Sequence, residues 1–507
     1  MHMYLLGIDV GTSGTKSIIF DLNGKIVSKA YIEYPLIFHK HNFIEQNPEI
    51  WWDAAIKTIK NAIEKASIKA NEINCVGLSG HTNTPSFIDK NGKPLYNSIV
   101  WMDRRAEKQA NAIREKIGNE KIHKITGVKI DPFYSVYKVL WLKENYPNII
   151  EKIHAILQPK DYIGLKLTGE FFLDKALASS SGYLDINKGE YAYDLLEEIG
   201  FPIEKLPKLV LPYEIVGEVN EEASNLTGLK KGTPVVAGSG DVMVNAIGCG
   251  TIEVGSAYNK MATASDIVVC IDHPIFDPKT RMVFYNHILP NKWLLVGGSN
   301  SGICYRWFRD QFGIIEKEIA KCLNKDPYEI MDAEAESIEP GSNNLIFLPY
   351  LTGARSPIWD TNAKGVFLGI TLNHGKNHFI RAILEGIAYD VKHRIEIIEK
   401  DFGIKINEIR IVGGGGRSNV WRQIMADIYN KPILLPAGSE QECFGAAIIA
   451  GYGAKIYKDI SKTVKELVPI IDIKEPKKEN IEKYAKLFKI YVELYDKLKE
   501  VFYLLSH

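Results

Sequence analysis

The chain has 507 residues, more than one hydrophobic core usually spans, so two domains of roughly 250 residues are expected. Apolar residues make up 46% and charged residues 24% of the chain, as in folded globular proteins. Lysine plus arginine and aspartate plus glutamate both total 62, so the basic excess typical of nucleic-acid-binding proteins is absent and no nucleic-acid partner is expected.

The start of the chain and its cysteines bear on where the protein resides. Tyr4-Leu5-Leu6 already reads as a strand, so no signal peptide is expected, and no apolar run reaches the ~18 residues of a membrane span. The six cysteines form no Cys-x-x-Cys pair, and buried free thiols are their expected state. We expect a cytoplasmic protein without a membrane partner.

The first 80 residues predict an α/β arrangement. Strands are expected over 4–10, 16–21 and 26–32, and the turn at 21–24 contains Asn-Gly, a hairpin signal because both residues tolerate positive φ. A helix is expected from Pro48, where apolar residues recur three and four apart, followed by a buried strand at 73–79. Hairpin strands followed by alternating helices and strands predict an α/β sheet with one antiparallel edge.

A similar plan recurs in the second half, where strands are expected within 234–241, 266–271, 292–298 and 408–416. We place the domain boundary near residue 250, giving domains 1–250 and 251–507. Residues 481–505 carry apolar side chains at helical spacing between lysines and glutamates. This stripe is interpreted as a packing face, and a homodimer contact is the alternative.

The turn between the first two strands has the composition of a phosphate-binding loop. Gly11 and Gly14 let the backbone approach an anion closely. Hydroxyl donors lie beside them at Thr12, Ser13 and Thr15. Asp9 would repel phosphate unless a divalent cation lay between them, so we expect it to contact magnesium through water. The alternative is an ordinary Gly-Thr hairpin, and a Walker sequence is absent.

Gly238-Ser-Gly240-Asp241 places a carboxylate after a strand and a glycine bend. Phosphoryl transfer needs a group that orients the attacking hydroxyl and accepts its proton, and Asp241 is the candidate. Gly-Asp is also a common turn pair, which is the alternative interpretation.

Four glycines at 413–416 follow the strand that begins at Glu408, and Ser418-Asn419 should start a helix after them. Glycines leave no side chains, so a flat ring could lie against this backbone. A plain loop is the alternative.

Together these segments resemble the FGGY family of carbohydrate kinases, with xylulokinase-like members closest in appearance. Residues 133–145 and 413–427 are similar to the two long signatures of that family, and further similarity lies at 350–360, 365–369 and 378–386. The resemblance runs across essentially the whole chain.

The resemblance implies two actin-like (ribonuclease H-like) ATPase domains flanking a catalytic cleft, the first binding sugar and the second nucleotide. It implies ATP and Mg²⁺ as cofactors, with Asp241 as base and both Asp9 and Asp241 at the metal. The residues implied for ATP and its phosphates are Gly11, Thr12, Ser13, Thr15, Lys16, Thr263, Gly414, Gly415 and Asn419.

The sugar pocket is expected in the first domain, at residues His81, Thr82, Asn83, Asp103, Arg105 and Asp241. The sequence departs from the family here, because Asn83 replaces the histidine of xylulokinases and Val242 cannot hydrogen-bond a sugar hydroxyl. The expected acceptor is a ketopentose such as D-xylulose, while gluconate, glycerol and erythritol stay open.

A second departure lies at 262–264, which reads Ala-Thr-Ala where the family has Gly-Thr-Ser. Ala264 lacks a hydroxyl, and Ser265 is the candidate to replace it. A different class of protein, an actin-like nucleotide sensor or chaperone ATPase without a sugar acceptor, is the remaining alternative.

Overall fold

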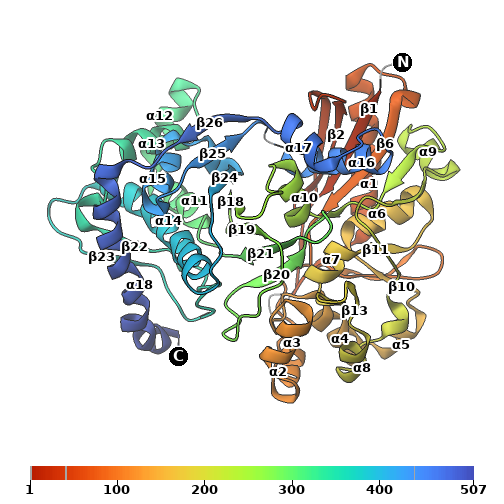
Figure 1. Ribbon diagram of the computed structural model, residues 1–507, viewed down its shortest axis with the longest axis horizontal. Coiled ribbons are helices and arrows are strands. Elements are labelled where there is room, and N and C mark those ends of the chain that lie inside the picture. The colour runs from red at the N-terminus through yellow and green to blue at the C-terminus, as the bar shows by residue number, and fades with distance from the viewer. Residues whose placement is uncertain (1–2, 40–42, 439, 507) are drawn as a thin grey trace. The chain divides into compact units, whose positions relative to one another are not determined.

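The computed structural model describes residues 3–39, 43–438 and 440–506, which divide into two compact units (Figure 1). The first unit comprises the chain up to Ile252 together with Asp272–Leu294 and Glu440–Val468. The rest of the described chain forms the second unit. Near the predicted boundary at residue 250 the chain leaves the first unit, and it later returns to that unit twice.

The first unit is built on a sheet with strand order β15-β16-β6-β1-β2-β3, and β17 also pairs with β6. β1, β2 and β3 are antiparallel neighbours, whereas β6 is parallel to β1. The strands are β1 (Tyr4–Val10), β2 (Gly14–Asp21), β3 (Ile26–Glu33), β6 (Ile73–Gly80), β15 (Ile215–Glu218), β16 (Pro234–Val236) and β17 (Ser239–Gly240). The predicted sheet with an antiparallel edge is confirmed.

The turn between β2 and β3 differs in detail from the prediction. Gly24 has a φ of 79°, but Asn23 does not have positive φ. The Asp21 carboxylate instead accepts hydrogen bonds from the amides of Asn23 and Lys25, both at 2.9 Å. The predicted hairpin between these strands is confirmed, and an aspartate-closed turn connects them.

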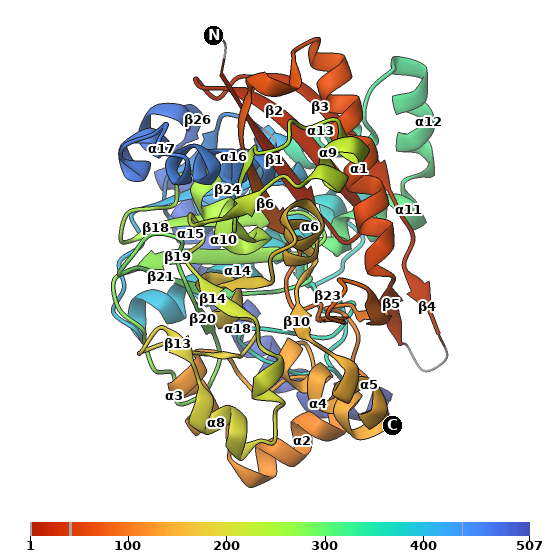
Figure 2. The same ribbon diagram turned by 90° about the vertical axis from the view of Figure 1, so that its right-hand side faces the viewer.

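Helices pack closely on this sheet. α1 (Pro48–Ala66) begins after the capping residue Asn47 and packs on β2 and β3, and α6 (Pro159–Thr168) contacts both α1 and β6 (Figure 2). α16 (Gln441–Gly453) packs on β1 and β6, where Figure 1 shows it in blue beside the red strands. Added Cβ atoms at Gly7 and Gly77 would lie 2.0 and 1.9 Å from carbonyl oxygens of α16, so glycine is required at both positions.

The remaining helices of the first unit surround this core. They are α2 (Glu107–Lys116), α3 (Asn119–Thr126), α4 (Ser135–Asn145), α5 (Pro147–Lys152), α7 (Lys175–Ser180), α8 (Tyr193–Glu198), α9 (Glu221–Thr227), α10 (Asp241–Gly248) and α17 (Ile460–Leu467). Short strands accompany them at β4 (Ile37–Phe38), β5 (Ile44–Gln46), β7 (Ser86–Ile88), β8 (Pro94–Tyr96), β9 (Ser98–Ile99), β10 (Ala155–Leu157), β11 (Phe172–Asp174), β12 (Leu184–Asp185), β13 (Glu190–Tyr191), β14 (Lys208–Val210) and β20 (Val283–Asn286).

The second unit repeats the plan with strands in the order β21-β19-β18-β24-β25-β26. β18 is antiparallel to β19 and parallel to β24. The strands are β18 (Ser256–Met261), β19 (Ser265–Ile271), β21 (Trp293–Gly297), β24 (Glu408–Val412), β25 (Ile433–Pro436) and β26 (Ile470–Lys474), and a separate pair is β22 (Ile346–Leu348) with β23 (Val366–Leu368). The predicted recurrence of the sheet is confirmed.

Six helices of the described chain accompany this second sheet. They are α11 (Ile303–Phe312), α12 (Ile314–Leu323), α13 (Pro327–Glu336), α14 (Lys376–Lys400), α15 (Asn419–Tyr429) and α18 (Lys478–Ser506). α18 packs on α14 and α15 and buries Tyr484, Leu487, Phe488, Tyr491 and Leu494. The C-terminal stripe is therefore a packing face, as predicted.

Two further expectations concern cysteines and membranes. The cysteines are free thiols, and all are buried except Cys322. Within the described part of the chain, no helix combines the length and apolar character needed to cross a membrane.

Candidate active site

Hydrogen bonds from Tyr34 stabilise the turn between β1 and β2. The Gly11 amide donates to the Gly14 carbonyl at 2.9 Å, and the Tyr34 hydroxyl donates to the Gly11 carbonyl at 2.6 Å. The Thr15 hydroxyl is buried and bonds the Tyr34 hydroxyl at 3.2 Å. Thr15 therefore supports the turn, while residues 11–13 remain at least partly exposed.

Thr12 is hydrogen-bonded to two residues, and one of them, Trp101, lies two positions before Asp103 of the predicted sugar pocket. Its hydroxyl accepts a hydrogen bond from the Trp101 indole at 3.0 Å, and its carbonyl accepts one from the Gln46 amide at 2.8 Å. Because the hydroxyl oxygen is the acceptor of the indole N–H, its own proton remains available to donate. The turn can thus offer one oriented hydroxyl and the amides of Thr12 and Ser13 to an anion, since the Gly11 amide is bonded to the Gly14 carbonyl.

Asp9 lies at the end of β1 in a region of surplus negative charge. It is 8% exposed and accepts a hydrogen bond from the Ser79 hydroxyl at 2.8 Å. Burial, together with the nearby carboxylates of Glu442 and Asp241, raises the pKa of Asp9 to about 7. A divalent cation would offset this charge.

Protein side chains alone do not complete a metal centre here. Across the described ranges, no group of three or more histidine, cysteine, aspartate or glutamate side chains is close enough to hold a metal ion. A cation beside Asp9 would therefore need further oxygen ligands from water or from a nucleotide, as magnesium commonly has.

Asp241 is the first residue of α10, directly after a glycine bend. Gly238 has a φ of 63°, and a Cβ there would lie 1.8 Å from the Leu78 carbonyl oxygen. A Cβ on Gly240 would lie 2.4 Å from the Thr82 methyl group. The backbone that leads to Asp241 thus lies against residues 81–84, the predicted sugar loop. Only glycine permits so close an approach.

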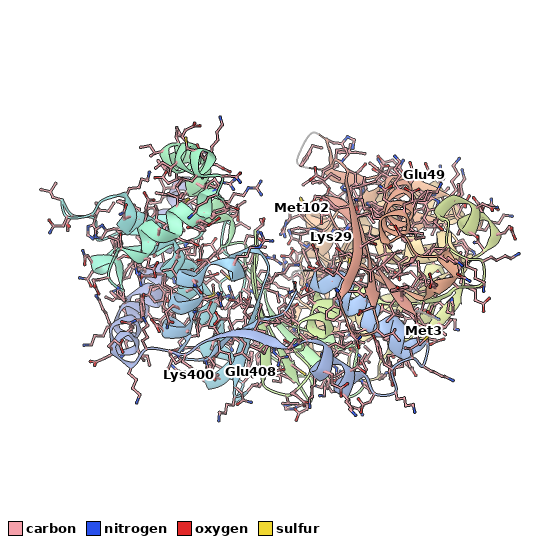
Figure 3. All side chains as sticks on the ribbon, turned by 90° about the horizontal axis from the view of Figure 1, so that it is seen from above. Met3, Lys29, Glu49, Met102, Lys400 and Glu408 are labelled. Atoms are coloured by element: carbon pink, nitrogen blue, oxygen red, sulfur yellow. The ribbon has the colours of Figure 1, made fainter. Side chains whose placement is uncertain are left out.

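Lys16 forms an ion pair at the start of α16. Its Nζ lies 2.9 Å from a Glu440 carboxylate oxygen, and the other oxygen lies 3.4 Å from Nζ of Lys29, which Figure 3 labels. Burial opposes the charge of Lys16, but the hydrogen bond and charge of Glu440, together with the charges of Asp9 and Glu442, outweigh burial, so the pKa of Lys16 is raised. Lys16 is therefore a permanent cation next to the turn.

His81 is a neutral hydrogen-bonding residue. Its Nδ1 and its backbone amide both bond the Val10 carbonyl at 2.9 Å. Burial lowers the pKa of the imidazole to about 4, so Nδ1 carries the proton and Nε2 is an acceptor. Nε2 is buried and has no hydrogen-bond partner among the described residues.

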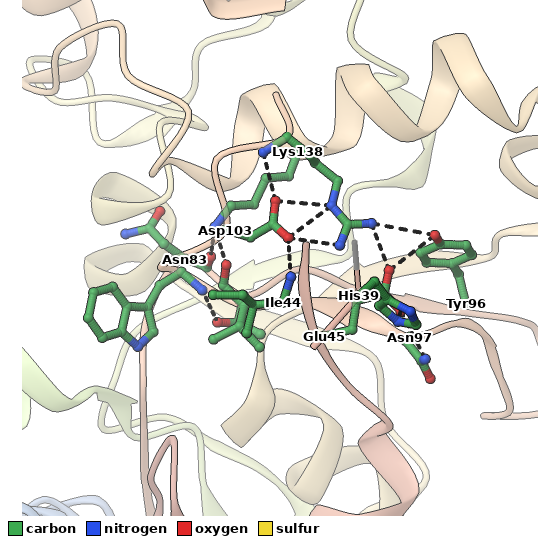
Figure 4. A network of polar contacts seen from close by, with 12 residues as sticks. His39, Ile44, Glu45, Asn83, Tyr96, Asn97, Asp103 and Lys138 are labelled. Atoms are coloured by element: carbon green, nitrogen blue, oxygen red, sulfur yellow. Dashed lines mark hydrogen bonds and ion pairs between the residues drawn. The ribbon is translucent and has the colours of Figure 1, made fainter. Parts of the chain in front are cut away.

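Asp103 and Arg105 form a buried ion pair (Figure 4). Arg105 donates to Asp103 at 2.8 Å and to Glu45 at 2.7 Å, and its guanidinium lies 4.1 Å from the Phe43 ring centroid. Asp103 also accepts from the Ile44 amide at 2.5 Å. The polar groups of Asp103 and Arg105, both predicted to bind substrate, are therefore bonded to other protein groups.

Lys138 of α4 also contacts the sugar loop (Figure 4). Its Nζ donates to the carbonyls of Asn83 at 2.7 Å and Val100 at 3.0 Å. Asn83 has a φ of 58°, and its side-chain oxygen accepts the Ser135 amide at 3.1 Å. The start of α4 thus holds the loop in a conformation that few residue types adopt.

The second unit contains a pocket of about 530 Å³ at the glycine-rich loop. Its lining includes the predicted residues Thr263, Gly414 and Gly415, beside the aromatic rings of Tyr305 and Trp421. The structure therefore brings three of the predicted nucleotide residues together.

Two neighbouring expectations have different outcomes. Asn419 begins α15 after its cap Ser418, as predicted, but its side-chain oxygen accepts a bond from Arg422 at 2.8 Å. The Ser265 hydroxyl is buried against the Ser301 hydroxyl, which in turn donates to Asp390 at 2.8 Å. Ser265 therefore does not replace the hydroxyl missing at Ala264.

Two family models match the chain. Residues 4–248 match the N-terminal domain of the FGGY family of carbohydrate kinases, and residues 261–454 match its C-terminal domain. The chain belongs to the FGGY family of carbohydrate kinases.

Relatives of this FGGY kinase carry two different names. A gluconokinase from Bacillus licheniformis is 32% identical, covering 97% of this chain and 96% of the relative. A xylulose kinase from Bacillus subtilis strain 168 is 29% identical and covers 98% of both chains. The ligand-bound crystal structure of a xylulose kinase from Lactobacillus acidophilus has a TM-score of 0.90 at 28% identity, again covering 98% of both chains.

These comparisons confirm the predicted family, the two-domain actin-like α/β fold and the enzyme class, a carbohydrate kinase. ATP is the nucleotide that kinases of this family use. The relatives do not select one acceptor, since both gluconokinases and xylulose kinases match.

Sequence reasoning missed several residues that contact the candidate site. Glu45 lies 60 positions from its partner Arg105, and Glu440 lies 424 positions from Lys16. Neither glutamate stands in a motif. Only the folded sheet brings such distant charges together, so no local pattern could have revealed them.

Proposed function

We propose that this FGGY kinase transfers the terminal phosphate of ATP to a terminal hydroxyl of a small uncharged sugar, with a ketopentose such as D-xylulose as the preferred acceptor. The observation that carries the proposal is the contact between the bend before Asp241 and the loop at Thr82. This contact supports Asp241 as the base, because the residue directly before it packs on the loop that resembles the sugar site.

The residues divide the reaction between them. Asp241 accepts the proton of the sugar hydroxyl as its oxygen attacks the terminal phosphorus, and the bond from phosphorus to the bridging oxygen of ADP breaks. The Thr12 and Ser13 amides and the Thr12 hydroxyl bind phosphate oxygens, and Thr263 is the proposed phosphate contact of the second unit. Asp9 and Asp241 fit a magnesium ion, which when bound would neutralise phosphate charge.

An uncharged acceptor is favoured by how the cations near the sugar loop are used. Arg105 is buried and bonded to both Asp103 and Glu45, and Lys138 donates to two backbone carbonyls. A carboxylate such as that of gluconate binds best to a cation with free donors. The acceptor nitrogen of His81 instead suits a hydroxyl donor.

The pocket of the second unit is the proposed adenosine site. Its volume of about 530 Å³ lies in the range of small-molecule sites, and Tyr305 and Trp421 supply aromatic surface. Gly415 permits the loop to approach Met261, since a Cβ there would lie 2.8 Å from the Met261 side chain.

Gluconate is the second candidate acceptor, favoured by the 32% identity to a gluconokinase. A coupled assay of ADP formation with D-xylulose, gluconate, glycerol and erythritol tests the proposal. We expect the highest kcat/KM with D-xylulose. A higher value with gluconate would overturn the choice of acceptor, and ATP hydrolysis that no acceptor stimulates would favour the sensor or chaperone ATPase.

A further inference from the structure

A chain of buried polar groups leads away from the proposed base. Ser239, two residues before Asp241, donates its hydroxyl to the Asp174 carboxylate at 2.7 Å. The other oxygen of Asp174 lies 2.9 Å from Nζ of Lys160, which also pairs with Asp161. All four side chains are 0% exposed, so water does not compete for these bonds.

Asp174 has a second task at the start of α7. The oxygen that accepts the Ser239 hydroxyl also accepts the amides of Ala176 at 3.1 Å and Leu177 at 3.0 Å. An acceptor of three donors is best satisfied as a carboxylate, and Lys160 supplies the positive charge that a buried carboxylate requires. The start of α7 and the segment before Asp241 therefore share one anchoring oxygen.

Lys160 also reaches the sugar loop through its backbone. Its amide nitrogen and Cβ lie 3.2 Å from where a Cβ on Gly80 would stand, and Gly80 is the β6 partner of Gly240. Leu177 of α7 would lie 3.1 Å from a Cβ on Gly240. The beginnings of α6 and α7 thus converge on the peptide that precedes Asp241.

We propose that Lys160, Asp174 and Ser239 are positioning residues that set the orientation of Asp241. This inference rests on the proposed role of Asp241 as base. A buried ion pair adds little net stability over well-packed apolar residues, whereas the directional bonds that Asp174 accepts from Ser239 and α7 fix geometry. Fixed geometry is what a base needs, since small displacements of a reacting group lower the rate strongly.

The test compares two buried serines of the first unit. Ser239→Ala removes the bond to Asp174 but leaves Asp174 bonded to α7 and Lys160. Ser28→Ala is the matched control, because the Ser28 hydroxyl is buried and donates to the Ala62 carbonyl at 2.6 Å. We expect Ser239→Ala to lower kcat ~10-fold with the KM for ATP unchanged, and Ser28→Ala to leave kcat unchanged at a similar loss of Tm.

Amide hydrogen exchange over residues 239–248 of the full-length protein gives a readout that needs no turnover. Ser239→Ala should accelerate exchange in this segment, and Ser28→Ala should not. Wild-type kcat and wild-type exchange in Ser239→Ala would overturn the positioning role. Failure of the wild type to phosphorylate any acceptor would instead count against the proposed function, and the exchange result would still decide whether Ser239 orders the segment.

Discussion

Asp241 combines three properties: it is a carboxylate, it lies in the first turn of α10, and the residue directly before it is a glycine. Asp241→Asn keeps the shape and the hydrogen-bonding oxygen but removes the basic group. We expect kcat to fall by about 10²–10⁴-fold, the usual cost of losing a general base. The coupled ADP assay, with circular dichroism to verify folding, measures this.

The control for Asp241→Asn is Asp194→Asn, an exposed aspartate in the first turn of α8. It should leave kcat unchanged. Full turnover in Asp241→Asn would assign the proton to another acceptor.

Asp9 should make the stability of the enzyme depend on pH. The pKa of Asp9 is about 7 in the folded protein, above the value of about 4 for an exposed aspartate. Between about pH 4 and pH 7 the unfolded chain therefore loses this proton more readily than the folded protein does. Stability contributed at low pH is thus lost as pH rises towards 7. Asp9→Asn should raise the free energy of unfolding by on the order of 2 kcal/mol more at pH 8 than at pH 5.

Urea denaturation without nucleotide or metal measures this difference. Asp53→Asn, which alters an exposed carboxylate on α1, serves as the comparison and should have the same effect at both pH values. A gain from Asp9→Asn that is equal at pH 5 and pH 8 would show that the carboxyl is not held protonated by its surroundings.

At the scale of elements, α4 acts on the sugar loop through Lys138. Burial holds the pKa of this lysine well below its usual value, and its carbonyl partners are Asn83 of the loop and Val100, which precedes Trp101. Lys138→Met should loosen residues 81–84 and raise the KM for the sugar about 10-fold, with a smaller effect on the KM for ATP. Steady-state kinetics with each substrate varied in turn provides the measurement.

Lys143→Met is the matched control, since Lys143 lies on the same helix and its side chain reaches the Gly200 carbonyl at the surface. Equal increases in both KM values after Lys138→Met would indicate general loosening of the first unit instead of a specific effect on the loop.

Elements with a local signal could be predicted from the sequence. The apolar and β-branched runs of β1 to β3, the start of α1 at Pro48 and the Ser418-Asn419 start of α15 all appear where their patterns indicate. The nucleotide pocket was foreseeable in part, because glycine runs have few other uses. The packing of α16 could not be predicted in this way. The helix is apolar on nearly every side, so its pattern does not indicate which face packs on which element.

The candidate site was less predictable than the fold. Asp103 and Arg105 were recognisable as a motif, but their saturation by each other and by Glu45 depends on β5, which is distant in sequence. Lys160 and Asp174 carried no signal at all, because a lysine and an aspartate in short helical starts are ordinary surface residues in most sequences. Charge pairing of this kind follows from tertiary structure only.

At the scale of the whole molecule, the sugar loop belongs to the first unit and the nucleotide pocket to the second. Under the proposed function both ligands must meet with water excluded, since water would compete as phosphate acceptor. We expect D-xylulose together with a non-hydrolysable ATP analogue to reduce the radius of gyration in small-angle X-ray scattering. Superimposable curves for the free and doubly liganded enzyme would contradict this.

The return of α16 to the sheet of the first unit has a consequence for biosynthesis. The carbonyls of Cys443 and Ala446 lie against Gly7 and Gly77, so α16, near residue 450, covers one face of β1 and β6. During translation this face emerges from the ribosome hundreds of residues before its cover. The apolar face of β1 and β6 therefore stays exposed in the nascent first half until α16 has been synthesised. The first strands of this FGGY kinase are thus among the last to be buried.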